Sequence, residues 1–172
     1  YYPHAEYTVD GVTTKYFAHK NGDLLVNATQ YNANATASLN GKNYSLKDAI
    51  NNKLWDEESG YYFDYDADKN KINKVKSVAS FLPLFAGICD LNRAKVLVEK
   101  LTDRNEFSCE FSIPSVAVSD GTFGTDMWRG PVWINYNYMI SEGLSEFGFK
   151  DLANEIIQKT IDVVEEWYKK KG

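Results

Sequence analysis

The sequence predicts an all-α domain that follows a short N-terminal β-hairpin. Two long segments, 90–102 and 151–170, carry apolar residues at helical spacing. Near the N-terminus, Asp10-Gly11 lies between two β-branched and aromatic runs, and this dipeptide favours the tight turn of a hairpin. The 172 residues are 44% hydrophobic, which is enough for a packed core without disulfides or a metal.

The first part of the chain after the hairpin is expected to contain two helices. One covers residues 23–39, and Asn40-Gly41 would end it in the way that helices commonly end. The Asn, Thr and Ser content of this segment lowers its helical propensity. Ser45 is then expected to cap a short helix that runs to about Trp55.

The second part is expected to alternate irregular segments with helices. Residues 56–70 predict a turn, a short aromatic strand and a polar loop, and 75–88 predict a helix. Pro83 within it predicts either a kink or a helix that starts near the proline. An irregular stretch follows over 103–131, and loops of this length inside compact domains are usually functional. A helix resumes at 132–146. In the last helix, 151–170, the expected buried stripe consists of Ile156, Ile157, Val164 and Trp167.

Composition argues against several classes of function. The net charge of −5, from 24 acidic and 19 basic residues, argues against a nucleic-acid partner. The sequence contains no run of 18 apolar residues, so it predicts no membrane span. The chain shows no secretory signal, which favours a location in the cytoplasm. The two histidines lie outside any ligand-spaced cluster, and the acidic run 64–70 lacks the Gly and Glu of a calcium loop. We therefore expect neither a metal nor another cofactor.

The strongest candidate for a binding site is the run from Phe123 to Tyr138. It carries two tryptophans five residues apart, Trp128 and Trp133, together with Arg129. Aromatic faces beside planar hydrogen-bonding groups suit a sugar ring, which has apolar C–H faces and hydroxyl edges. The alternative is that both tryptophans belong to the core and that the arginine lies at the surface. The density of these residues on a long loop favours a site.

The run Trp128-Arg-Gly-Pro-Val-Trp-Ile-Asn-x-Asn137 closely resembles the signature of glycoside hydrolase family 63. Further segments resemble the family in the same order, namely 54–66, 81–88, 113–116 and 143–148. The resemblance covers about residues 46–172, whereas residues 1–45 match the family poorly. It also explains Pro83 as the first-turn proline of an inner helix.

The resemblance implies an (α/α)6 toroid, a six-hairpin glycosidase barrel, and we expect 23–172 to form its C-terminal half. Residues 1–22, with their predicted hairpin, are expected to be an N-terminal extension. Twelve helices of about 11–12 residues with loops of about 4–6 need roughly 190 residues or more. The rest of the barrel, from the same polypeptide or a partner chain, is therefore an expected partner.

The resemblance also implies an inverting α-glucosidase-like hydrolase with a general acid and a general base, whose carboxyls lie about 6.5–9.5 Å apart. Neither catalytic carboxylate of the family matches a position in this chain, so the isolated chain is expected to be inactive. Asp126 and Glu166 are the local acids that could serve instead. Their simpler interpretations are a loop acid or turn cap for Asp126 and a solvated helix face for Glu166, which neighbours Glu165.

The expected ligand is a small α-linked disaccharide or oligosaccharide. The residues expected to bind it are Trp128, Arg129, Gly130, Pro131, Trp133, Asn137 and Trp55. Two other classes remain open, a non-catalytic carbohydrate-binding helical module and a structural helical domain whose tryptophan loop is core.

Overall fold

A computed structural model describes the chain in six stretches, namely residues 2–9, 12–18, 24–27, 36–39, 42–66 and 68–171. The chain divides into two compact units, Tyr1–Ala49 and Ile50–Gly172. The boundary that the sequence suggested at residue 22 lies within the first of these units.

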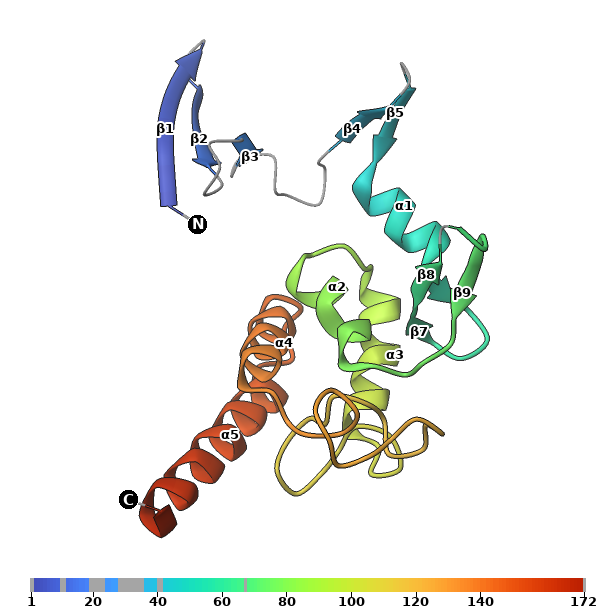
Figure 1. The fold of residues 1–172 in the computed structure, drawn as a ribbon, viewed down its shortest axis with the longest axis vertical. Helices are drawn as coiled ribbons and strands as arrows, with labels where there is room; N and C mark the ends of the chain where they lie inside the picture. The colour runs from blue at the N-terminus through green and yellow to red at the C-terminus, as the bar shows by residue number, and fades with distance from the viewer. Residues whose placement is uncertain are drawn as a thin grey trace. The chain divides into compact units, whose positions relative to one another are not determined.

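The first unit consists mainly of paired strands (Figure 1). Strands β1 (Tyr2–Val9) and β2 (Val12–Ala18) pair antiparallel with Val9 opposite Val12, which confirms the hairpin expected around Asp10-Gly11. Strand β3 (Leu24–Asn27) pairs with β2 on its other side. The β-structure of this unit is therefore more extensive than the single hairpin that the sequence predicted.

The helix expected over residues 23–39 is wrong. That segment instead contributes β3 and strand β4 (Thr36–Leu39), and β4 pairs antiparallel with β5 (Lys42–Ser45). Leu39 lies opposite Lys42, so Asn40-Gly41 separates two paired strands. Asn-Gly favours a hairpin turn as strongly as a helix end, and the Thr, Ser and Asn around it favour strand and turn over helix.

Helix α1 (Leu46–Lys53) begins where the sequence predicted, because the Ser45 hydroxyl accepts a hydrogen bond from the Asp48 N–H at 3.2 Å. Two small antiparallel strand pairs follow. They are β6 (Trp55–Asp56) with β7 (Tyr61–Tyr62), and β8 (Asp64–Asp66) with β9 (Lys71–Asn73). The sequence predicted one strand here because the short pairs carry too few residues for a clear alternation.

The expected third helix is shorter than predicted. It consists of the 3-10 turn η1 (Val78–Phe81) followed by α2 (Leu82–Phe85), with Pro83 in the first turn. Helix α3 (Leu91–Thr102) matches its prediction, and the side chain of Asp90 caps it.

The two C-terminal helices, α4 (Ile134–Glu146) and α5 (Lys150–Lys171), lie side by side, and α2 lies against α4 (Figure 1). Gly143 lets α2 approach α4 closely, since a Cβ at this position would lie 2.5 Å from the Phe85 nitrogen. The core of this unit contains Phe81, Leu84, Leu97, Phe107, Ile140 and Leu144, all almost fully buried.

The stripe predicted for the last helix is only partly correct. Ile156 is buried, but Val164 and Trp167 are 47% and 62% exposed. Helical spacing identifies a common face but not how far along the helix that face is covered. Ile50–Gly172 is thus a helix-rich unit that leaves apolar side chains of α5 exposed. Across the described part of the chain, no helix has the length and apolar character needed to cross a membrane.

Candidate functional site

The candidate site is built on the irregular segment between α3 and α4. Its floor, residues 112–117, is buried and pairs on both sides through isolated β-bridges, Ser77 with Val116 and Pro114 with Val132. The loop 121–131 rises from this floor and leads into α4. The chain thus holds an irregular loop by backbone pairing rather than by regular secondary structure.

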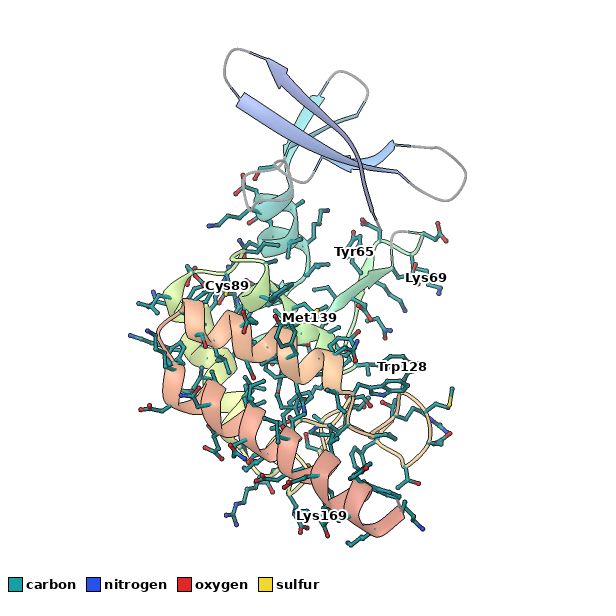
Figure 2. All side chains as sticks on the ribbon, turned by 90° about the vertical axis from the view of Figure 1, so that its left-hand side faces the viewer. Tyr65, Lys69, Cys89, Trp128, Met139 and Lys169 are labelled. Atoms are coloured by element: carbon teal, nitrogen blue, oxygen red, sulfur yellow. The ribbon has the colours of Figure 1, made fainter. Side chains whose placement is uncertain are left out.

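The two tryptophans of the predicted site stack on each other. The Trp128 and Trp133 rings lie 3.8 Å apart between centroids, with an interplanar angle of 8°. Trp128 is 49% exposed, whereas Trp133 is half-buried. Figure 2 shows the Trp128 side chain on the loop that leads into α4. The pair therefore presents an aromatic surface to solvent and is not a pair of core residues.

Arg129 and Asp126 form an exposed ion pair beside the tryptophans, with 2.6 Å between guanidinium and carboxylate. The hydrogen bond from Arg129 lowers the pKa of Asp126, and the same contact raises the pKa of Arg129. An ionised, solvent-exposed carboxylate can accept hydrogen bonds but is unsuited to donate a proton as a general acid.

Gly130 and Pro131 fix the base of the loop. Gly130 is buried with a φ of 145°, and a Cβ there would lie 1.9 Å from the Gly124 carbonyl oxygen. Its N–H donates to the Ser115 hydroxyl at 2.8 Å. Glycine is required here because the backbone approaches too closely for a side chain.

Asn137 does not reach the loop surface. It is fully buried, and its amide nitrogen donates to the Thr160 hydroxyl at 2.9 Å. The Thr160 hydroxyl in turn donates to the Ile156 carbonyl, so the contact joins α4 to α5. The Asn137 side-chain oxygen is buried with no hydrogen-bond partner among the described residues.

Trp55 lies in the core rather than beside the tryptophan pair. It is 8% exposed, its ring centroid lies 4.8 Å from that of Tyr62, and the Arg93 guanidinium lies 5.0 Å from its ring. Burial raises the pKa of Tyr62 to about 12. This cluster joins β6 and β7 to α3.

Glu166 and its neighbour Glu165 lie exposed on the C-terminal half of α5. Each pairs with a lysine one turn further along the helix, Glu165 with Lys169 at 3.2 Å and Glu166 with Lys170. These are ordinary helix-surface ion pairs. Among the described residues, no group of three or more His, Cys, Asp or Glu side chains lies close enough together to hold a metal ion.

The sequence did not reveal a polar network that holds the floor in place. The Lys76 ammonium binds the Glu106 carboxylate at 2.8 Å and the Ser119 hydroxyl at 3.0 Å, and the Lys76 N–H donates to Asp120. Burial raises the pKa of Glu106, but the bonds from Lys76 and Ser119 outweigh it and hold that pKa below its ordinary value. No local spacing could have identified these partners, because Lys76 and Glu106 are 30 residues apart.

Comparisons with known proteins agree on a family. A sequence model of the mannosylglycerate hydrolase MGH1-like glycoside hydrolase domain matches residues 2–171. The match therefore includes residues 2–45, which resembled the family poorly. Mannosylglycerate hydrolase of Thermus thermophilus is 38% identical over 113 residues, which are 65% of this chain and 27% of that protein. A probable mannosyl-oligosaccharide glucosidase of Schizosaccharomyces pombe is 37% identical over 97 residues, 52% of this chain and 12% of that protein.

Solved structures agree with the sequence comparisons. A family 63 mannosylglycerate hydrolase from Thermus thermophilus superposes with a TM-score of 0.61 in complex with Tris and D-glycerate and 0.59 in complex with glucose. It is 36% identical to the chain, and the superposition covers 66% of the chain and 27% and 29% of the two relatives' chains. The chain spans about a quarter of the length of the mannosylglycerate hydrolases that it matches. Since the family model covers nearly all of its residues, the chain belongs to the mannosylglycerate hydrolase MGH1-like glycoside hydrolase domain family, which confirms the resemblance to glycoside hydrolase family 63.

Proposed function

We propose that the chain forms the C-terminal half of the catalytic domain of an inverting glycosidase and supplies one of its sugar subsites. The observation that carries the proposal is the parallel stack of Trp128 on Trp133, with half of Trp128 exposed. An aromatic face held rigidly at the surface suits the C–H face of a pyranose. Arg129, beside it, offers planar donors for hydroxyl groups or for a carboxylate.

The proposed substrate is a small α-linked glycoside, with a hexose linked to glycerate as the first choice. Two of the relatives that the chain resembles are named as hydrolases of mannosylglycerate, and a mannosylglycerate hydrolase from Thermus thermophilus has been solved with D-glycerate and with glucose. Glycerate carries a carboxylate, which an exposed guanidinium can bind through two parallel hydrogen bonds. In this proposal the sugar would stack on Trp128.

Hydrolysis with inversion requires one carboxylic acid to protonate the leaving oxygen and one carboxylate to activate water. We assign neither role within the chain. Asp126 is ionised and paired with Arg129, and Glu166 is paired with a lysine on an exposed helix face. The remaining helices of an (α/α)6 toroid would supply both carboxylates, and they would also cover apolar side chains that are exposed on α5, such as Val164 and Trp167.

Two measurements on the purified 172-residue chain test the proposal. Calorimetric titration with mannosylglycerate, trehalose and maltose should show binding that Trp128→Ala removes, with mannosylglycerate bound most tightly. Turnover of an aryl α-glucoside should be undetectable. Turnover that Asp126→Asn abolishes would overturn the assignment of both carboxylates to other segments. Binding without turnover, when the chain is combined with the segments that carry the two carboxylates, would favour a non-catalytic carbohydrate-binding module.

A further inference from the structure

The base of the loop that carries the tryptophan pair is bonded to Ser115 of the floor. Ser115 is 3% exposed, and its backbone is bonded on both sides. Its carbonyl accepts from the Val78 N–H at 2.9 Å, and its N–H faces the carbonyls of Gly130 and Pro131 at 3.4 and 3.2 Å. Ser115 therefore joins the segment before α2 to the base of the loop.

The Ser115 side chain adds a contact that the backbone alone cannot make. Its hydroxyl accepts from the Gly130 N–H at 2.8 Å in a buried position. The backbone packs closely around Gly130, since a Cβ there would lie 1.9 Å from the Gly124 carbonyl oxygen. A buried N–H without an acceptor is unfavourable, so the hydroxyl holds this peptide in one orientation.

Gly130 lies between the two stacked rings in sequence, two residues after Trp128 and three before Trp133. Pro131 follows it with a restricted φ. The orientation of the Gly130 peptide therefore determines where the Trp128 ring lies relative to the Trp133 ring. The other bonds of the loop tip are internal: the Gly124 N–H donates to the Arg129 carbonyl, and the Arg129 N–H donates to the Asp126 carbonyl.

We propose that Ser115 is a positioning residue for the sugar subsite, whose hydroxyl sets the stack of Trp128 on Trp133 through the Gly130 amide. Ser115 takes no part in the chemistry and does not contact the sugar. That the stack binds sugar rests on the function proposed above. The dependence of the stack on Ser115 does not, and the two statements can be tested separately.

Fluorine NMR of the full chain labelled with 5-fluorotryptophan tests the positioning role, because its four tryptophans give separate reporters. Ser115→Ala should shift or broaden the resonances of Trp128 and Trp133 and leave that of Trp167 unchanged. Ser80→Ala is the matched control, since Ser80 is a serine of similar burial whose hydroxyl donates to the Tyr62 carbonyl at 2.6 Å. Its effect should fall on Trp55, which packs on Tyr62.

Unchanged Trp128 and Trp133 resonances in Ser115→Ala would overturn the proposal, as would the same pattern of changes in both variants. If Ser115→Ala does not fold, hydrogen exchange of the unaltered chain decides. The Gly130 amide should then be protected as strongly as the Val78 amide, and exchange as fast as at the exposed Gly121 would overturn the proposal.

A sugar titration of the same labelled chain separates the two proposals. Mannosylglycerate should move the Trp128 resonance, and Ser115→Ala should weaken that binding about two- to tenfold, the loss expected of one neutral hydrogen bond. Equal affinity in the two proteins would overturn the positioning role. If the sugar moves no resonance, the proposed function fails, while the comparison of Ser115→Ala with Ser80→Ala still tests the positioning of the stack.

Discussion

Replacement of Gly130 by alanine should destabilise the domain by disrupting the base of the tryptophan loop. A φ of 145° costs an alanine about 1–3 kcal/mol. The new Cβ would lie 1.9 Å from the Gly124 oxygen, so the backbone segments at Gly124 and Gly130 must separate by about 1.5 Å to reach an ordinary contact of 3.4 Å. Overpacking of this kind costs about a further 1–3 kcal/mol. We therefore expect a loss of about 2–6 kcal/mol in the free energy of unfolding.

Urea unfolding followed by circular dichroism measures this loss. With a denaturant slope of about 2 kcal/mol per molar, the midpoint should fall by about 1–3 M. Gly121→Ala in the same loop is the first control, because a Cβ there meets nothing within 4 Å. Gly148→Ala is the second, since it has a positive φ of 88° but open space and so isolates the backbone cost. A Gly130→Ala protein as stable as Gly121→Ala would refute the reasoning.

Three further substitutions have expected outcomes that the same urea assay checks. Gly143→Ala places a Cβ 2.6 Å from the Leu84 carbonyl carbon and should cost about 1–3 kcal/mol in the free energy of unfolding. The control, Asn135→Ala at an exposed position of the same helix, should be neutral or slightly stabilising. Equal effects of the two substitutions would contradict the close approach of α2 and α4. Glu106→Gln should cost about 1–3 kcal/mol at neutral pH. Folding lowers the pKa of Glu106, so its contribution to the free energy of unfolding is present above the ordinary pKa of 4.5 and is lost as the pH falls through the folded pKa. A stability difference between the two proteins that does not change with pH would contradict this. Ser112→Gly should stabilise by about 1 kcal/mol, because it relieves a φ of 84° and removes a buried hydroxyl without a partner, and a loss of stability would show that the strain is not there.

Local sequence signals predicted those parts of the fold that local interactions determine. Helix α3 has a clear apolar face and an Asp90 cap, and the hairpin has its Asp-Gly dipeptide, so both formed as expected. The prediction of a helix over residues 23–39 was wrong because Asn40-Gly41 is compatible with a helix end and with a hairpin, and only pairing with β5 decides between them. The exposure of Val164 and Trp167 depends on what packs against α5, which spacing within the helix cannot show.

The structure also brings together only some of the residues that were expected in the candidate site. The density of aromatic residues on one loop identified Trp128 and Trp133, and the structure stacks them. Trp55 and Asn137 were expected to bind sugar from the resemblance to the family, but the structure buries both, Trp55 against Tyr62 and Asn137 against α5. Ser115 carries no signal of its own, because its role comes from a bond to a residue 15 positions away.

The contact between sugar protons and the Trp128 ring is the most direct test of the proposed subsite. A sugar stacked on the exposed indole places its C–H protons in the ring current, so the proton NMR spectrum of mannosylglycerate should show selective upfield shifts on one face of the hexose when the chain is added. Trp128→Ala should abolish these shifts and leave the chain folded, because the side chain is half exposed and lies outside the core. Shifts that persist in Trp128→Ala, or a variant that unfolds, would contradict the assignment of this loop as a sugar subsite.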